Sequence, residues 1–318
     1  MHRQRTRLAA RVNRVASAIE RRGIAATYEL HDRALSNRRS RRLFAREQPR
    51  LGETQRQVLA RLDADGYAVL PFADLAGAEA WERVAAAGDA FAAATESGLA
   101  AEARGEGAGE LRRRAGKEFL VRRYSFDGVT LDLDEPWLAA CLSPPLLDLA
   151  NAYLRMWSKL SYVDWWYSIP QPAGTERVAS QLWHFDFDDR HLLKAFVYLV
   201  DVDESAGPFE YVPGSQPGGR YHDVRPWAPM AYGRVPEQEV AARVPRQEVR
   251  TFTAPRGTLI LCNTSGLHRG GFATGKPRVL ATATYCSPAS LAALSVRNYG
   301  LAGTLGGPDN AAARFAAS

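Results

Sequence analysis

The stretch Gln181-Leu-Trp-His-Phe-Asp-Phe187 is the most informative part of this chain. Its aromatic residues alternate with His184 and Asp186, as in a strand whose two faces meet different surroundings. Residues i and i+2 of a strand point to the same face, so we expect the imidazole and the carboxylate to project together. A second histidine from another strand would complete a two-histidine, one-carboxylate facial triad, which leaves coordination positions open on a ferrous ion.

A lone His-x-Asp pair is weak evidence, because most such pairs are surface residues. The residues around and after it strengthen the interpretation. The flanking aromatic side chains indicate that the polar face is enclosed. His268 stands 82 residues after Asp186, beyond the candidate strand Thr258–Cys262, and Arg278 opens another β run ten residues later. These residues extend the candidate site to a third ligand and a permanent positive charge.

The composition is that of an ordinary globular protein. The 318 residues are 46% hydrophobic and 24% charged, which is enough to bury a substantial core without disulfides. No run approaches the roughly 18 apolar residues that span a bilayer, and no apolar segment follows the basic start, so we expect neither a membrane span nor a signal peptide. Three cysteines without C-x-x-C spacing favour a reducing cytoplasmic location and argue against zinc.

Positive charge is concentrated at the N-terminus. The net charge is +6, and residues 1–60 hold 15 arginines against five acidic residues, whereas the rest of the chain is slightly acidic. A helix within a basic extension over residues 1–51 is predicted by apolar residues at three- and four-residue steps, namely Leu8, Val12, Val15 and Ile19. Two interpretations stay open: a solvated helix or subunit contact, and a site for nucleic acid, a membrane surface or another acidic partner.

Residues 52–318 are expected to form one domain that is mainly β with flanking helices. Helices are predicted at about 52–64, 75–91 and 144–157, with a surface loop at 98–110. Short strands punctuated by Gly and Pro indicate a sandwich or barrel. The candidate strands are Phe119–Tyr124, Leu160–Ile169, Gln181–Phe187, Lys194–Val200, Phe209–Val212, Glu248–Thr253, Thr258–Cys262, Leu267–Phe272 and Arg278–Cys286.

The order of motifs resembles a known family. Trp-His-x-Asp at 183–186, Val-Pro-Gly-Ser at 212–215 and Gly-Thr-Leu-Ile at 257–260 are followed by His268 and Arg278. This order resembles the phytanoyl-CoA dioxygenase family of Fe(II)- and 2-oxoglutarate-dependent oxygenases, and the likeness covers roughly residues 52–290. It implies a double-stranded β-helix, a cupin-like jelly roll, with the metal inside one end.

The resemblance assigns roles to four residues. It implies that His184, Asp186 and His268 are the iron ligands and that Arg278 pairs with the distal carboxylate of 2-oxoglutarate. A guanidinium suits that task, because its fork grips a carboxylate bidentately. The resemblance also implies that the enzyme uses O₂, in addition to Fe(II) and 2-oxoglutarate. The retained carboxylate of Asp186 favours a hydroxylase over the related halogenases, which replace it with a small residue.

Other cosubstrate contacts are less specific. Lys194 and Tyr198 share one strand face and Tyr167 lies on another, and each is either a cosubstrate contact or part of the barrel wall. Arg190 and His191 follow the metal motif and are expected either to line the pocket or to be solvated. The chain departs from the family at two positions. Gln216 stands where a histidine is usual, and Gly270 stands where a small hydroxyl residue is usual.

The long segment 214–247 is interpreted as a lid or a disordered loop, because structureless stretches of that length are uncommon in a compact domain. Its arginines, among them Arg225 and Arg234, are candidates to bind an anionic or polyhydroxylated substrate.

The leading function is therefore a dioxygenase that hydroxylates a small molecule, by analogy in secondary metabolism. The same iron-oxygen chemistry could instead give desaturation, cyclisation or epimerisation, and the sequence does not separate these outcomes. A nucleic-acid-binding protein is less favoured, because no helix-turn-helix, zinc-finger or RNA-binding signature is found. An inactive jelly-roll scaffold is disfavoured by the intact motif residues, and homo-oligomerisation is left open.

Overall fold

The computed structural model describes residues 23, 26–106, 111–124, 129–229, 233–291, 298–306 and 310–318. The apolar residues of the expected N-terminal helix, Leu8 to Ile19, lie outside the described residues. The helices are α2 (Tyr28–Arg33), α3 (Ser36–Arg46), α4 (Glu53–Asp65), α5 (Phe72–Ala76), α6 (Ala78–Ala103), α7 (Pro136–Leu142), α8 (Pro144–Leu154), α9 (Glu237–Ala241) and α11 (Ala311–Ala316). The strands are β1 (Tyr67–Pro71), β2 (Arg112–Arg114), β3 (Lys117–Arg122), β4 (Val129–Asp132), β5 (Lys159–Ser168), β6 (Leu192–Tyr198), β7 (Glu210–Tyr211), β8 (Arg250–Thr251), β9 (Thr258–Cys262), β10 (His268–Arg269), β11 (Arg278–Cys286) and β12 (Tyr299–Ala302).

Two antiparallel sheets form the body of the protein. The larger has the order β1-β9-β6-β11-β5-β3-β2, and the smaller has the order β10-β7-β8. Between them lies an apolar cluster that draws on both sheets, including Phe196, Ile260 and Leu280 from the larger and Phe209 and Tyr211 from the smaller. The expectation of a mainly β fold with flanking helices, in a jelly-roll arrangement, is confirmed by these packed sheets.

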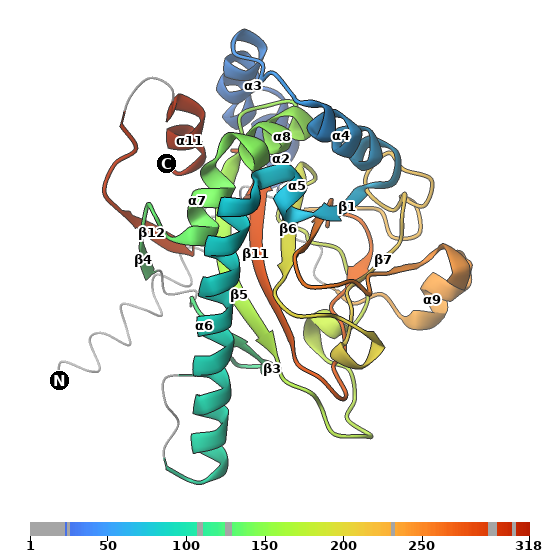
Figure 1. Ribbon diagram of the computed structural model, residues 1–318. Helices are drawn as coiled ribbons and strands as arrows, with labels where there is room; N and C mark the ends of the chain where they lie inside the picture. Colours follow the sequence, from blue (N-terminus) through green and yellow to red (C-terminus); the bar gives the residue numbers. More distant parts are fainter. Residues whose placement is uncertain are drawn as a thin grey trace, which may run out of the picture.

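The helices cover the outer face of the larger sheet. α6 runs across β5 and β11, with α7 and α8 beside it (Figure 1). Residues of β11 alternate accordingly: Val279 and Ala281 pack toward the helices, whereas Arg278 and Leu280 face the interior between the sheets. The alternation decides which side chains of each strand can reach a site inside the jelly roll.

The prediction of a strand over Gln181–Phe187 is wrong. A short 3-10 helix, Ala179–Gln181, is followed by one isolated bridge between His184 and His268, and residues 185–191 belong to no strand. The bridge joins the His184 segment to the edge of the smaller sheet beside β10. The aromatic side chains that suggested a strand, Trp183 and Phe185, instead anchor the segment in a separate apolar cluster. The alternation of aromatic and polar residues in the sequence therefore reflects the burial of these two side chains and not the pairing of a strand in a sheet.

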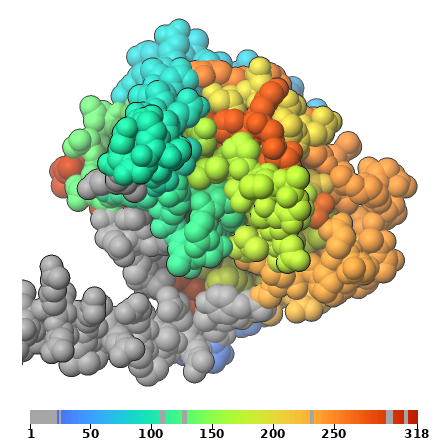
Figure 2. Space-filling view, turned by 90° about the horizontal axis from the view of Figure 1, so that it is seen from below, coloured from blue at the N-terminus to red at the C-terminus, as the bar shows by residue number. Residues whose placement is uncertain are grey.

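The expected lid, residues 214–247, is ordered over its described residues. Four of its valines are buried in the same cluster as Trp183: Val224, Val235, Val240 and Val244. In Figure 2 this segment, in orange, forms one side of the face seen from below, next to the lime-green residues that follow β5. Within the described ranges, no helix has the length and apolar character needed to cross a membrane.

Candidate metal centre

Three potential metal ligands converge at the edge of the smaller sheet. The bridge places His184 beside His268, with backbone N–H···O distances of 2.9 and 2.8 Å and ring centroids 4.2 Å apart. The backbone N–H of Asp186 donates to the carbonyl of Thr264 at 2.8 Å. One ligand atom from each of His184, Asp186 and His268 lies within 4.8 Å of the other two. The three residues expected from the sequence are therefore brought together.

Both imidazoles are held in the tautomer that a metal needs. Nδ1 of His184 lies 2.8 Å from the carbonyl oxygen of Leu182, and Nδ1 of His268 lies 3.0 Å from that of Gly266. A carbonyl oxygen only accepts, so each Nδ1 carries the proton and each Nε2 keeps its lone pair. Burial lowers the pKa of His184 well below its ordinary value and lowers that of His268 to about 4. Both rings are thus neutral near pH 7.

Asp186 is ionised and is held by a lysine. Burial by itself would raise its pKa, but Lys194, followed by His268 and His184, brings the pKa far below its ordinary value. The Nζ of Lys194 lies 2.6 Å from Oδ2 of Asp186. The indole N–H of Trp227 donates to the backbone carbonyl of Asp186 at 2.8 Å. The carboxylate is available as a metal ligand at any pH near neutrality.

The Val-Pro-Gly-Ser turn supports the strand that carries His268. Ser215 accepts the backbone N–H of Leu267 at 2.7 Å and donates to the carbonyl of Val212 at 2.6 Å. Gly214, with φ 75°, makes the left-handed turn that this arrangement needs. Gln216, which replaces the usual histidine, is buried and accepts a hydrogen bond from the Tyr211 hydroxyl at 3.1 Å. The glutamine is a structural part of the turn.

Arg278 is a buried cation in need of a partner. It is 5% exposed, its Nη1 donates to the carbonyl of Gly207 at 2.7 Å, and within the part of the chain that the structure describes its Nε has no hydrogen-bond partner. Burial lowers its pKa, and among the described residues only the Tyr198 hydroxyl acts against that effect. A buried guanidinium without a carboxylate is costly unless a ligand supplies one. Its surroundings therefore fit the distal carboxylate of 2-oxoglutarate, just as the two neutral imidazoles and the carboxylate fit Fe(II).

Comparison with known proteins agrees with this donor set. The family model described as "Phytanoyl-CoA dioxygenase (PhyH)" matches residues 62–279, more than half of the chain. The chain belongs to this family. It is accordingly an Fe(II)- and 2-oxoglutarate-dependent oxidoreductase that uses O₂.

Several solved structures are similar to this PhyH-family enzyme. EctD from S. alaskensis, solved with 2-oxoglutarate and 5-hydroxyectoine, is 19% identical over 76% of this chain and 78% of that chain, with a TM-score of 0.49. HygX from Streptomyces hygroscopicus, with nickel, 2-oxoglutarate and hygromycin B, is 16% identical over 74% and 88%, with a TM-score of 0.45. SnoN, an epimerase from nogalamycin biosynthesis, is 18% identical over 74% and 81%, with a TM-score of 0.44. No curated protein matches the chain.

The remaining candidate residues of the PhyH-family enzyme divide between the two faces of the larger sheet. Tyr198 faces the interior beside Arg278, and its hydroxyl donates to the carbonyl of Phe252 at 3.0 Å. Tyr167 is a correction: it lies on the helix-covered face, in the main core, with its hydroxyl 3.4 Å from Glu96. Pairing of β5 with β11 puts Tyr167 opposite Val279 rather than Arg278, so its side chain points away from the site. Gly270, which stands where the family usually has a small hydroxyl residue, makes a backbone contact: its N–H donates to the carbonyl of Ser180 at 2.6 Å.

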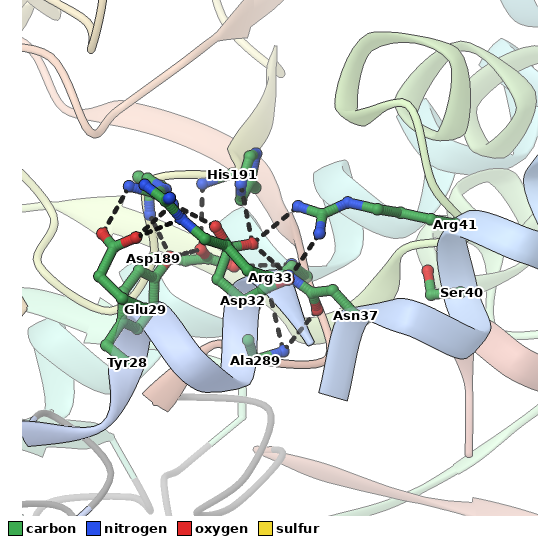
Figure 3. Close-up of polar contacts among 12 residues, drawn as sticks. Tyr28, Glu29, Asp32, Arg33, Asn37, Ser40, Arg41, Asp189, His191 and Ala289 are labelled. Atoms are coloured by element: carbon green, nitrogen blue, oxygen red, sulfur yellow. Dashed lines mark hydrogen bonds and ion pairs between the residues drawn. The ribbon is translucent and has the colours of Figure 1, made fainter. Parts of the chain in front are cut away.

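Arg190 and His191 are partly exposed and contact the N-terminal segment. The guanidinium of Arg190 forms an ion pair with Asp32 of α2, and Nε2 of His191 lies 3.1 Å from the same carboxylate (Figure 3). This contact joins the loop after the metal motif to the N-terminal segment. No periodicity or motif in the sequence indicated it, because the partners are more than 150 residues apart.

Two more cations lie near the metal centre. Lys117 was not identified from the sequence, and Arg234 was named only as one of the arginines in the segment 214–247. Lys117, at the start of β3, is within electrostatic reach of Lys194, Arg234 and Asp186. Burial, and then the neighbouring cations, lower the pKa of Lys117 to about 8. Arg234, in the segment 214–247, is likewise close enough to affect both histidines. Positive charge thus gathers on the approach to the three ligands.

Proposed function

We propose that this enzyme hydroxylates a small molecule at an iron bound by His184, Asp186 and His268, with 2-oxoglutarate held by Arg278. The observation that carries the proposal is the convergence of three ligand atoms within 4.8 Å, with both histidine Nδ1 atoms bound to carbonyl oxygens. When bound, Fe(II), 2-oxoglutarate and O₂ supply the oxidising power to break a substrate C–H bond, while 2-oxoglutarate becomes succinate and CO₂.

The residues of the chain prepare that chemistry by binding and orientation. The two imidazoles and one carboxylate would hold the metal, and three protein ligands would leave room for the cosubstrate and O₂. Arg278 would bind the distal carboxylate of the cosubstrate and so orient it. Phe209 packs against the ring of His268 at 5.6 Å and against Phe196 at 5.2 Å. Both phenylalanine rings are buried in the apolar cluster between the sheets, so they would keep water away from this side of His268.

The substrate class that the charges favour is an anion. Lys117 and Arg234 stand near the metal ligands in addition to Lys194, which already pairs with Asp186. Asp188 is an acidic neighbour of this group; burial raises its pKa to about 6, so it stays mostly ionised at pH 7 and, with Asp186, offsets two of the three positive charges. A carboxylate or phosphate on the substrate would offset the surplus of positive charge. The enzyme would then select its substrate partly by charge at the entrance to the site.

Anaerobic titration tests the metal and cosubstrate assignment. Fe(II) added with 2-oxoglutarate should give a weak visible charge-transfer band in the wild-type enzyme, and His184→Ala should abolish it. His222→Ala is the matched control, because His222 is exposed and its Nδ1 contacts only its own turn, at Gly219. A wild-type enzyme without the band, or an undiminished band in His184→Ala, would remove the proposal.

A further inference from the structure

The backbone around Asp186 is not fixed by a sheet. Residues 185–191 lie between the bridge at His184 and the start of β6, outside any ladder of strand hydrogen bonds. The position of a metal-ligating carboxylate must be set to within a few tenths of an ångström. Contacts from elsewhere in the chain therefore have to replace the missing ladder.

Tyr28 of α2 contacts the loop directly, where its hydroxyl also accepts the backbone N–H of Arg190 at 3.2 Å, and indirectly through Trp227. Its side chain is 2% exposed, and its hydroxyl donates to Oδ1 of Asp189 at 2.5 Å. Its ring packs against that of Trp227, with centroids 5.2 Å apart. Trp227 in turn donates to the backbone carbonyl of Asp186 at 2.8 Å. One residue of the N-terminal segment thus touches Asp189 directly and Asp186 through a single intervening ring.

Asp32, one turn further along α2, completes the connection. It is 1% exposed and forms ion pairs with Arg190 and, at 2.9 Å, with Arg41 of α3, and its carboxylate lies 3.1 Å from Nε2 of His191 (Figure 3). Asn37 donates to it at 2.6 Å and accepts the backbone N–H of Ala289 at 2.9 Å. A buried carboxylate with this many partners is fully compensated, so the contact is specific in its geometry.

We propose that the segment Tyr28–Arg46 is a positioning element for the metal centre. Through Tyr28 and Asp32 it holds the loop 188–191, and through Trp227 it holds the carbonyl of Asp186, in the arrangement that receives Fe(II). The inference rests on the proposed function, because it assumes that Asp186 binds the metal. It gives part of the basic N-terminal extension a role inside the enzyme, distinct from contact with an acidic partner.

The decisive variant is Tyr28→Phe, which removes the hydroxyl and keeps the ring against Trp227. Loss of a group that orients a metal ligand typically weakens metal binding by about 10- to 100-fold. We expect at least about a tenfold rise in the Kd for Fe(II), measured anaerobically in the presence of saturating 2-oxoglutarate. Arg33→Gln is the matched control on the same helix: Arg33 is 75% exposed and pairs only with Glu29.

Thermal unfolding of the metal-free proteins separates positioning from general stability. The inference predicts that Tyr28→Phe and the control melt at similar temperatures without metal, and that Fe(II) with 2-oxoglutarate raises the melting temperature less in Tyr28→Phe. Trp227→Phe provides a second route, because it removes the N–H donated to Asp186 and should weaken Fe(II) binding in the same way. It decides the matter if Tyr28→Phe does not fold.

The outcomes are distinguishable. Fe(II) affinities within twofold of wild type in both variants overturn the positioning role, even when the wild-type enzyme binds Fe(II) and 2-oxoglutarate normally. A fall in melting temperature without metal that accounts for the whole loss of binding also overturns it, since the segment would then be merely stabilising. A wild-type enzyme that shows no Fe(II)–2-oxoglutarate band removes the proposed function itself, and the positioning role with it.

Discussion

Arg278 offers the sharpest prediction, because its side chain is buried and only partly bonded. Its Nη1 donates to the carbonyl of Gly207 and the Tyr198 hydroxyl lies beside it, while its Nε has no hydrogen-bond partner among the described residues. Replacing it by glutamine removes the charge and the guanidinium fork. The folded state should tolerate this change, since a buried charge that lacks an acidic partner is itself unfavourable.

The expected loss concerns the binding of 2-oxoglutarate. Hydrogen bonds to charged groups contribute about 1.5–3 kcal/mol each, and a bidentate contact makes two of them. Because the glutamine amide can restore part of one, we expect Arg278→Gln to lose about 3 kcal/mol, which is roughly a 150-fold rise in Kd. Arg278→Lys keeps the charge but not the fork, and we expect a smaller rise of about tenfold.

The assay is anaerobic titration of the Fe(II)-loaded enzyme with two cosubstrates, followed by the charge-transfer band. 2-Oxoglutarate carries the distal carboxylate, whereas 2-oxobutanoate can chelate a metal but lacks that group. The variant should lose affinity for 2-oxoglutarate and bind 2-oxobutanoate as the wild type does. A Kd for 2-oxoglutarate within threefold of the wild-type value would refute the reasoning. An equal loss of affinity for both compounds would show that the substitution distorts the site and does not only remove the contact to the distal carboxylate.

Three further predictions concern charge. Because burial and neighbouring cations lower the pKa of Lys117 to about 8, kcat/KM for an anionic substrate should fall as the pH rises through that value, and Lys117→Met should flatten the profile; an unchanged profile contradicts its role. Asp164→Ala leaves the buried guanidinium of Arg122 without its ion pair, so denaturant unfolding should show a loss of about 3–5 kcal/mol, and a loss under about 1 kcal/mol would contradict this. The pKa of Asp32 is lowered in the folded state by His191 and Arg190 against the effect of burial, so its contribution to stability is complete above its ordinary value of 3.8 and is lost as the pH falls below it. Asp32→Asn should therefore lose less stability than wild type on acidification through that range, and parallel curves would exclude the effect.

The sequence was most informative where function demands particular residue types in order. His184, Asp186, His268 and Arg278 could be found because metal ligation and carboxylate binding restrict the side chains that serve, and the turn at 212–215 needs glycine for its left-handed residue. The assignment of the segment around His184 to a strand failed for a physical reason. Alternating burial also arises when aromatic side chains anchor an irregular segment, as Trp183 and Phe185 do.

Contacts between distant parts of the chain left no such signal. Tyr167 was a plausible cosubstrate contact until the register of β5 against β11 placed it on the helix-covered face. Lys117 reaches the site because the β2–β3 hairpin pairs beside β5. The pairing of Asp32 with Arg190 depends on where α2 docks, which neither residue's neighbours in sequence reveal.

The ion pair between Lys194 and Asp186 has a consequence for the order of binding. With Nζ 2.6 Å from the carboxylate, a divalent cation bound to Asp186 would be placed close to an ammonium group, and the two repel each other. A dianionic cosubstrate removes that surplus charge, so Fe(II) and 2-oxoglutarate should each strengthen the binding of the other by the same factor. Fe(II) titrations with and without 2-oxoglutarate measure this factor, for which we expect at least about tenfold, or about 1.4 kcal/mol. Lys194→Met should bind Fe(II) more tightly in the absence of cosubstrate and show weaker coupling. If the variant instead binds Fe(II) more weakly and retains the coupling, Lys194 orients the carboxylate for the metal and does not compete with it.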